Sequence, residues 1–459
     1  MPIIVLLSST IALANIFNYL IPNNLIPIKE IPAYGQDSTS HIDGSYTKFI
    51  DPVNLSKNMR DSVYGQVAAY GKNVYVVWEE DKETATSVNN ANDKSHDNRN
   101  YDIYFKKSKD GGATFSKAIN LSNNSGFSEH PQIAVSGSDV YIAWTDSTSI
   151  KKEILFRMSS DEGNSFGKII KLSDSSLESY NQEIAAFANN VYVVWENNNS
   201  SSIVLKASTD RGNTFKDIKT ITNNGAERAG VGESYPKIAA YGNNVYLVWN
   251  VGMAPYTFKD GDNNEDYNKT NSKDQRGEEQ HHQHQGIFFT KSSDNGDNFG
   301  NIVKLNNQAS PVGESQIAAS GDQVYIVWSG NSDNLIPNDL FFIKSIDKGN
   351  SFTYETILSK KSSLNAELAT YGNNLYVLWQ DFLKGKTDNN NNQEILIKMS
   401  KDRGDIFTDV IKNISHNKGV SECPSIAVSQ NILYLVWEDD TLGNHEIFFT
   451  RSDNQYKLS

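Results

Sequence analysis

The pattern of apolar and polar residues along the chain repeats as a unit of two apolar runs, of which the second ends in tryptophan. The second run is β-branched, aromatic and apolar at every position, which is typical of a strand that is buried on both faces. Between the two runs stand Gly, Asn, Asp or Gln, the residues of a tight hairpin. The unit occurs seven times and uses all seven tryptophans of the chain, Trp78, Trp144, Trp195, Trp249, Trp328, Trp379 and Trp437.

Each of the first six units continues into a third strand-like run and then into the pattern Ser-x-Asp-x-Gly-x-x-Phe. In such a turn the aspartate carboxylate accepts backbone N–H groups, and the glycine adopts the positive φ that a bulkier residue resists. The phenylalanine is expected to pack back between two layers of sheet. A short fourth strand, such as KAINLS, then completes the unit. The six aspartates are Asp110, Asp161, Asp210, Asp294, Asp347 and Asp402.

Seven four-stranded units in succession predict an all-β fold, a seven-bladed β-propeller, in which each sheet is covered by its two neighbours. The seventh unit has Trp437 and a third strand (EIFFTRS) but lacks the aspartate turn. The N-terminal segment FIDPVNLS, residues 49–56, matches the fourth strand of the first unit, FSKAINLS. We therefore expect this N-terminal strand to complete the last blade and close the ring, with the C-terminal QYKLS as the alternative.

The N-terminus differs in kind from the repeats. Residues Pro2 to Pro22 form an apolar run that is diluted only by Ser, Thr and Asn, and Ala33-Tyr34-Gly35 offers small residues for a signal peptidase. We interpret residues 1–35 as a signal peptide or a retained N-terminal anchor and residues 36–44 as a linker. Residues 45–459 then form the propeller, with polar insertions at 79–101 and 250–286. Either interpretation makes the propeller extracellular or exposed at the cell surface.

Composition narrows the range of partners. The net charge is −13, and Lys and Arg are scattered singly, which disfavours nucleic acid. Cys423 is the only cysteine, so no disulfide stabilises the domain. No definite cofactor is implied. Calcium is one option at an acidic mouth, and a transition metal is another at the run His281-His282-Gln283-His284.

One position in the loops leading into the innermost strands departs from the repeat. Counting back three residues from the first apolar residue of each of these strands gives a different kind of polar or aromatic side chain in almost every blade. The seven residues are Tyr64, His130, Asn181, Tyr235, Glu314, Asn365 and Cys423, and Glu129, Glu178, Glu233 and Glu422 stand close to them in sequence. Seven such residues converging on one axis are typical of a ligand-binding funnel. Solvated loops that are free to vary would give the same pattern.

The Ser-x-Asp-x-Gly-x-x-Phe pattern resembles the Asp-box (BNR) repeat of the sialidase-like propellers, over about residues 45–459. The resemblance implies that the aspartates of the turns are structural, so we do not nominate them as catalytic. Carried over to activity, it implies an exo-sialidase-like glycoside hydrolase with arginines that grip a carboxylate, a tyrosine nucleophile paired with a glutamate, and an acid/base aspartate. The residues that match by type and by face are Arg60 and Arg228, Tyr235 with Glu233, and Asp61.

The sequence departs from that family at three points. Asn58-Met59-Arg60-Asp61 stands where an Arg-Ile-Pro segment is expected, no third arginine lies in a loop of this face, and we count seven blades instead of six. Binding of a glycan, a peptide or an envelope partner is therefore the preferred hypothesis. The alternatives are a sialidase-like hydrolase and a hydrolase of neutral glycans that uses two carboxylates across the mouth.

Overall fold

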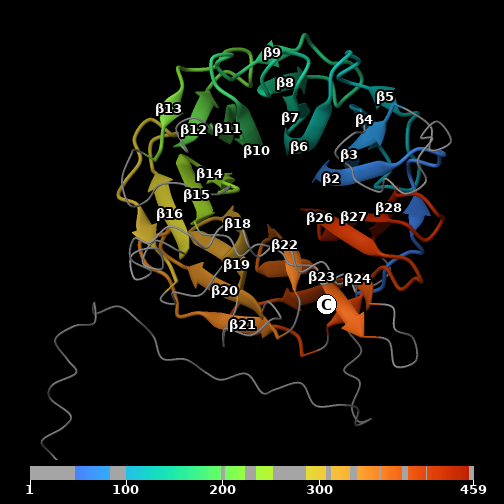
Figure 1. Cartoon of the computed structure of the whole chain (residues 1–459). Coiled ribbons are helices and arrows are strands. Elements are labelled where there is room, and N and C mark those ends of the chain that lie inside the picture. Colours follow the sequence, from blue (N-terminus) through green and yellow to red (C-terminus); the bar gives the residue numbers. More distant parts are fainter. Residues whose placement is uncertain are drawn as a thin grey trace, which may run out of the picture.

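The protein is a ring of seven four-stranded antiparallel sheets, as the computed structural model shows (Figure 1). The structure describes residues 47–82, 100–197, 202–222, 234–251, 286–306, 312–330, 339–360, 363–384, 391–409 and 411–453. These residues are strands, turns and irregular segments, and no helix among them could cross a membrane. The predicted all-β, seven-bladed propeller is confirmed.

Each blade runs from the axis of the ring outward. The innermost strands are β2 (Ser62–Tyr70), β6 (Ser128–Ser136), β10 (Ser179–Phe187), β14 (Lys237–Tyr241), β18 (Val312–Ser320), β22 (Leu364–Tyr371) and β26 (Ser421–Ser429). The second strands are β3 (Asn73–Asp81), β7 (Asp139–Asp146), β11 (Asn190–Asn197), β15 (Asn244–Val251), β19 (Gln323–Gly330), β23 (Asn374–Lys384) and β27 (Ile432–Asp439).

The third and fourth strands form the outer part of each blade. The third strands are β4 (Tyr101–Ser108), β8 (Glu153–Ser159), β12 (Ser202–Ser208), β16 (Gly286–Ser292), β20 (Asp339–Ser345), β24 (Asn391–Ser400) and β28 (Glu446–Arg451). The fourth strands are β5 (Ile119–Asn120), β9 (Ile170–Lys171), β13 (Lys219–Thr220), β17 (Val303–Lys304), β21 (Thr356–Ser359), β25 (Lys412–Asn413) and β1 (Val53–Asn54). We number the blades 1 to 7 in the order of their innermost strands.

The core lies between the blades, as the apolar second strands require. All seven tryptophans are buried, and each hydrophobic cluster combines residues of two adjacent blades. Tyr75 and Phe105 of blade 1, for example, pack in one cluster with Trp144 of blade 2. The innermost strands contact their neighbours in sequence around the ring, and β26 contacts β2. A second strand is therefore apolar on both faces because a sheet covers each of them.

The aspartate turns have the hydrogen bonds that their sequence predicts. In blade 1, Thr114 donates its backbone N–H to Asp110 Oδ1 at 2.9 Å, and Ser108 Oγ donates to the same oxygen at 2.7 Å. Gly112, with φ of 81°, donates its N–H to Ser108 Oγ at 2.8 Å. These bonds hold the pKa of Asp110 at about 2, with the Thr114 side chain as the largest cause. The Asp110 carboxylate is thus engaged by hydrogen bonds within its own turn.

The phenylalanine of each turn connects neighbouring blades. Phe166 of blade 2 meets Phe105 of blade 1 edge to face, with ring centroids 5.0 Å apart. Phe115 of blade 1 meets Phe449 of blade 7 in the same way at 4.9 Å. Each turn is therefore anchored on the third strand of the preceding blade.

Blade 7 takes its fourth strand from the N-terminal side of the chain. Val53 pairs with Phe449 and Asn54 with Phe448, so β1 is the outermost strand of the sheet that also contains β26, β27 and β28. Leu55 follows β1, donates its N–H to the Ile447 carbonyl at 2.7 Å and is 3% exposed. Non-local pairing of this kind fixes the last blade to the start of the propeller. The C-terminal QYKLS lies outside the described residues.

Replacing Leu55 by alanine is expected to lower the free energy of unfolding by about 2 kcal/mol, because the cavity opens between blades 7 and 1. Val53→Ala, on the adjoining strand β1 but 40% exposed, should change the free energy of unfolding by less than about 0.5 kcal/mol. Urea unfolding of both variants measures the difference. Equal effects of the two substitutions would show that β1 does not stabilise the ring.

Two predicted insertions begin later than the sequence analysis placed them. Glu79 pairs with Ile103, Asp81 with Tyr101, and Val251 with Gly286, so residues 79–81, 101, 250–251 and 286 are strand. Hydrogen bonding to the third strand extends the second strand past its tryptophan. Residues 83–99 and 252–285 of the two insertions, the latter with the histidine run, lie outside the described residues, as do residues 1–46 with the predicted signal or anchor and linker.

Candidate functional site

A ring of β-bulges surrounds one end of the propeller axis. In blade 1 the pairing of β2 with β3 slips between Val63 and Gln66, and the same irregularity interrupts β6, β10, β18, β22 and β26. The bulge falls at the position that the sequence analysis singled out. We call these seven residues the bulge ring: Tyr64, His130, Asn181, Tyr235, Glu314, Asn365 and Cys423.

Six of the seven bulge-ring residues have a left-handed backbone. Their φ values run from 41° at Tyr235 to 54° at Asn181, and Glu314 is the exception. A positive φ is costly for a residue with a Cβ, and bulges are commonly found where a strand re-aims a side chain next to a site. The left-handed backbone recurs in six blades, while the side chain at this position differs from blade to blade. The repeated backbone conformation thus presents a varied set of side chains at the axis.

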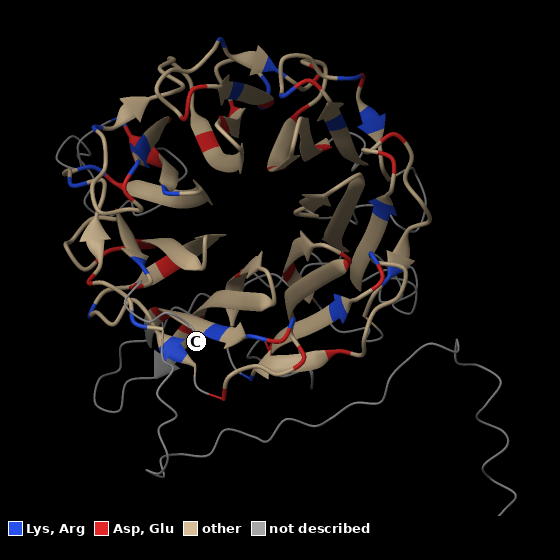
Figure 2. Cartoon of the chain, turned by 180° about the vertical axis from the view of Figure 1, so that it is seen from behind, with Lys and Arg blue, Asp and Glu red and all other residues tan. Residues whose placement is uncertain are grey.

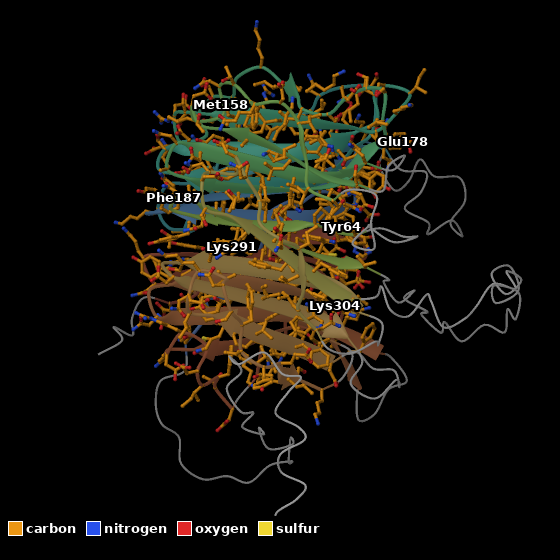
Figure 3. All side chains as sticks on the ribbon, turned by 90° about the vertical axis from the view of Figure 1, so that its left-hand side faces the viewer. Tyr64, Met158, Glu178, Phe187, Lys291 and Lys304 are labelled. Carbon is orange, nitrogen blue, oxygen red and sulfur yellow. The ribbon has the colours of Figure 1, made fainter. Side chains whose placement is uncertain are left out.

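The bulge ring lies at the opposite end of the axis from the hairpins that join the first and second strands. Figure 3 shows Tyr64 and Glu178 toward one end and Phe187, the last residue of β10, toward the other. Tyr64 is 40% exposed, and its ring contacts that of His130 edge to face at 4.7 Å. Adjacent blades therefore bring their bulge-ring side chains into direct contact.

Buried side chains on the second strands hold the bulges in place. Each is the residue directly after the tryptophan, and in four blades it accepts the N–H of a residue at the bulge of the next blade. Glu438 accepts from Tyr64 at 3.0 Å, Gln380 from Cys423 at 3.2 Å, and Glu79 from His130. We call this set the support positions: Glu79, Thr145, Glu196, Asn250, Ser329, Gln380 and Glu438, all 0–5% exposed.

Sequence reasoning missed the support positions, although a signal was present. It assigned Glu79 to the start of a loop, because an acidic residue after an apolar run is usually solvated. The signal was the register, since a polar residue follows the tryptophan in every blade. Burial and the bulge N–H together give this residue its structural role.

A second ring of polar residues lies two positions further along the innermost strands. Lys237 of β14 forms an ion pair with Glu183 of β10 at 3.0 Å, and Gln316 of β18 donates to Glu367 of β22 at 2.9 Å. Burial alone would lower the pKa of Lys237, but Glu183, Glu367 and Glu314 together raise it. Burial raises the pKa of Glu367 to about 8, although Lys237 opposes the rise. Charges from four blades therefore interact at the axis.

The acidic groups of blades 7 and 1 are coupled in the same way. Burial, with repulsion from Glu422 as the next cause, raises the pKa of Glu438 to about 8. Burial also raises the pKa of Glu79 well above its ordinary value, and that of the Cys423 thiol, which lies 3.8 Å from Asn365 Nδ2. Burial thus raises the pKa of several neighbouring acidic groups of the mouth.

The predicted ligand-binding residues divide into the bulge ring and residues that precede it along the chain. Tyr64, His130, Glu314 and Asn365 belong to the bulge ring, where Asn365 Nδ2 also donates to Gln380 Oε1 at 2.9 Å. Glu129 and Glu422 directly precede bulge-ring residues on β6 and β26, and Glu178 precedes β10. Glu129 forms an ion pair with Lys152 at 2.8 Å, Glu178 is half-buried just before β10, and burial raises the pKa of Glu422.

Of the predicted catalytic set, the structure describes Arg60, Asp61 and Tyr235, and it holds Arg60 and Asp61 in contacts of their own. The Arg60 guanidinium forms an ion pair with Glu80 and lies 5.9 Å from the centre of the Tyr104 ring, on the third strand of blade 1. Asp61 is buried, and its carboxylate accepts the His445 N–H at 2.9 Å, which connects blade 1 to blade 7. Tyr235 is half-buried on the bulge ring in blade 4. Arg228 and Glu233 lie outside the described residues.

The other arginines of the described part of the chain lie on outer strands or aspartate turns. Arg157 donates to the carbonyls of Leu121 and Gly167, and Arg211 grips Asp139 with two hydrogen bonds of 2.6 and 2.8 Å. Arg403 donates to Asn373 Oδ1, and Arg451 is on β28. Figure 2 shows most Lys and Arg positions toward the rim of the ring. No described innermost strand carries an arginine, so these residues supply no carboxylate clamp at the axis.

The innermost strands are acidic instead. Their charged residues are Glu129, Glu183, Glu314, Glu367 and Glu422 against Lys237. Within the described ranges no three His, Cys, Asp or Glu side chains are placed to hold a metal ion. The described innermost strands thus offer hydrogen-bonding groups, aromatic contact and carboxyl groups at this end of the axis.

Comparisons with known proteins give distant structural similarity. No family model matches the chain, and no curated protein matches it. Among solved structures it is similar to a sialidase of Trypanosoma rangeli in complex with sialic acid, at 14% identity and a TM-score of 0.44. That alignment covers 87% of this chain and 58% of the sialidase, so the chain spans less than two thirds of its length.

Two further structures are similar at the same level. The endosialidase of phage phi92 is 10% identical with a TM-score of 0.48, over 90% of this chain and 71% of the phage protein. The Hadza microbial sialidase Hz136 is 12% identical with a TM-score of 0.44, over 86% of this chain and 66% of the sialidase. Similarity this low transfers neither activity nor site residues to this chain.

Proposed function

We propose that this chain is an exported or cell-surface propeller that binds a glycan or an envelope partner at the bulge ring. The observation that carries the proposal is the bulge ring itself. Six of the seven blades interrupt the strand pairing with the same bulge, and buried acceptors hold a backbone N–H of this segment in four blades. The seven blades nevertheless present Tyr, His, Asn, Glu and Cys at one end of the axis. A scaffold that repeats while its presented groups vary is suited to recognition.

Binding is preferred over hydrolysis because of where the arginines and the carboxyls stand. Recognition of a sialic acid carboxylate needs a cluster of arginines, and the described innermost strands supply one lysine and several glutamates. Exposed Tyr64 and His130, together with the amides of Asn181 and Asn365, offer the ring faces and hydrogen-bonding groups that sugars and peptides use.

The test of this proposal is binding to an immobilised glycan panel and to whole cells by the wild type and by Tyr64→Ala. We expect Tyr64→Ala to weaken binding by about tenfold or more, as for an aromatic anchor at the centre of an interface. Tyr70→Ala is the matched control, because Tyr70 is on the same strand, is 54% exposed and stands at the other end of the axis. If Tyr70→Ala weakens binding and Tyr64→Ala does not, the site lies at the other end of the axis, where hairpins join the first and second strands.

Hydrolysis stays the second candidate because burial raises the pKa of two carboxyls near the axis. Glu367 and Glu438 have pKa values of about 8, which suits a general acid at neutral pH. Turnover of fluorogenic glycosides, including a sialoside, by the wild type that is lost in Glu367→Gln or Glu438→Gln would make the protein a glycosidase. Turnover that depends on Arg228 and Glu233 would favour the sialidase-like set.

A further inference from the structure

Two aspartate turns carry exposed isoleucines where the other turns carry polar residues. Ile406 of blade 6 is 72% exposed, at the position that holds Thr, Ser, Thr, Asn and Ser in blades 1 to 5. Ile346 of blade 5 is 63% exposed, at the position that holds Lys, Ser, Thr, Ser and Lys in the other five turns. Exposed isoleucines in two successive turns therefore depart from the repeat.

The isoleucine at 406 removes a hydrogen bond from its turn. In the other five turns the side chain at this position donates to Oδ2 of the turn aspartate, as Thr114 does to Asp110 at 2.6 Å. Ile406 keeps the backbone bond, and its N–H donates to Asp402 Oδ1 at 2.9 Å, but its side chain has no donor. The turn of blade 6 thus exposes an apolar side chain in place of a group that the scaffold uses elsewhere, which indicates a contact outside the scaffold.

The turns of blades 5 and 6 meet each other. Lys344 Nζ forms an ion pair with Asp405 Oδ1 at 2.6 Å. Lys344 is two residues before Ile346, and Asp405 directly precedes Ile406. Tyr371, the last residue of β22 in blade 6, adds a third exposed side chain at this end of the axis and is 42% exposed. The three side chains therefore belong to one side of two adjacent blades.

The N-terminal segment joins the propeller beside the turn of blade 6. Thr47 Oγ1 donates to the sulfur of Met399 at 3.7 Å, and the Thr47 carbonyl accepts from Lys412 Nζ at 2.8 Å. Met399 is the penultimate residue of β24, and its carbonyl accepts the N–H of Thr408 at 2.8 Å. Thr408 is two residues after Ile406. The first described residue of the chain thus lies close to an exposed isoleucine.

This junction is at the opposite end of the axis from the bulge ring. Met158 and Lys291 occupy the position of Met399 in blades 2 and 4, and Figure 3 shows both toward the same end as Phe187 and away from Tyr64. The residues before Thr47 include the apolar run of residues 2–22. A segment that is predicted to enter a membrane is therefore connected to the hairpin end of the propeller.

We propose that the hairpin end of blades 5 and 6 rests on the lipid surface of the membrane that holds the N-terminal segment. This inference rests on the cell-surface location in the proposed function, with the N-terminal anchor retained, and gives the propeller an orientation. Ile346, Ile406 and Tyr371 enter the lipid interface, where aliphatic and tyrosine side chains are favoured. A contact of this size is weak for a free protein, but the anchor makes it intramolecular. The bulge ring then faces away from the membrane.

The charges at this end are compatible with a lipid surface. Asp405 is paired with Lys344, and Asp322 forms an ion pair with Lys348 at 3.3 Å. These carboxylates already have cationic partners, so they add little repulsion toward lipid phosphates. Lys401, exposed in the turn of blade 6, has a side chain long enough to extend past the isoleucines to the headgroups.

The test is hydroxyl-radical footprinting of the full chain in phosphatidylcholine vesicles and in detergent, resolved by residue with mass spectrometry. We expect oxidation of Ile346, Ile406 and Tyr371 to fall by at least about threefold in vesicles, because lipid covers them. Met59 and Ile150, which are exposed in loops at the bulge-ring end, should be oxidised equally in both. Protection at both ends, at neither end or only at the bulge-ring end would overturn the inference. A full chain that does not float with the vesicles would overturn it too.

A double variant taken from the repeat tests the role of the isoleucines. Ile346→Ser with Ile406→Thr installs residues that other turns already have, Ser in blades 2 and 4 and Thr in blades 1 and 3, so the turns keep their fold. We expect oxidation of Tyr371 in vesicles to rise to its level in detergent, with a thermal midpoint at or above that of the wild type. Ile150→Ser is the matched control and should leave the protection of Tyr371 unchanged. Full protection of Tyr371 in the double variant would contradict the proposal.

Two further outcomes separate this inference from its alternatives. Protection of the three residues in detergent that grows with protein concentration would identify a second copy as the partner of this face and overturn the lipid contact. Tyr64-dependent binding of a glycan or of cells without the vesicle footprint would leave the proposed function standing and remove only the orientation. The footprint without any Tyr64-dependent binding would keep the orientation and remove the proposed function.

Discussion

Replacing Gly112 by alanine is expected to lower the free energy of unfolding by about 3–4 kcal/mol, since a strained φ and overpacking act together. Gly112 has φ of 81° in the aspartate turn of blade 1. A Cβ at this residue would lie 2.5 Å from Cζ of Phe449, a ring that is 0% exposed in the core between blades 7 and 1. The ring cannot withdraw without disturbing its contact with Phe115.

The matched control is Gly71→Ala. Gly71 also has a positive φ, of 60°, but no atom lies within 4 Å of the position of its Cβ. The control should lower the free energy of unfolding by only about 1–2 kcal/mol, which is the cost of the backbone conformation alone. Chemical unfolding of both variants gives the two free energies. If they are equal, the turn does not depend on close packing against the preceding blade.

Raising the pH from 5 to 9 is expected to destabilise the protein. Burial raises the pKa of Glu367 and Glu438 to about 8, so the folded chain retains protons that the unfolded chain releases above the ordinary glutamate range. Stability from these groups is fully present below that range and is lost as the pH rises through about 8. Each group can contribute up to about 1.4 kcal/mol per pH unit within this window.

The aspartates of the turns act in the opposite direction at lower pH. Hydrogen bonds from the Ser or Thr of the turn hold the pKa of Asp110 and Asp210 at about 2. Their stabilisation is present above the ordinary aspartate range and is lost as the pH falls toward 2. The thermal midpoint, measured across pH, should therefore be highest near pH 5.

Glu438→Gln tests whether this carboxyl causes the loss of stability at high pH. Gln380 occupies the equivalent position in blade 6 and accepts the Cys423 N–H at 3.2 Å, so the repeat shows that an amide fits there. The thermal midpoint of the variant should equal that of the wild type at pH 5 and be higher than that of the wild type at pH 9. The control is Asp217→Asn, because Asp217 is exposed between the aspartate turn and β13. Its thermal midpoint should equal that of the wild type at every pH. A wild type more stable at pH 9 than at pH 5 would contradict the assignment.

The support positions explain how a strained ring can vary in sequence. The acceptor in each pair bonds the backbone N–H of the bulge, which is indifferent to the side chain that the bulge carries. Tyr64 and Cys423 are held in this way despite their different chemistry. Side chains at the axis are thereby free to differ, while the backbone that presents them is constant.

The sequence by itself determined the architecture because its signals are local and repeated. A strand that is apolar at every position, a hairpin residue and the Ser-x-Asp turn each act within a few residues, and their recurrence determines the number of blades. The hydrogen bonds of Asp110 to Thr114 and Ser108 span at most four residues. Such features fold in the same way in every blade and can be read from the order of residues.

The site was decided by the tertiary structure, because its members come from different blades. Lys237 is paired with Glu183, and Glu79 with the His130 backbone, only when neighbouring blades are packed together. Arg60 has the right type for a clamp, but Glu80, folded beside it, binds its guanidinium. The low dielectric that raises the pKa of Glu367 likewise exists only in the closed ring. Residue type and spacing located the bulge ring, whereas long-range packing determined which of its groups are held by neighbours and which face the axis.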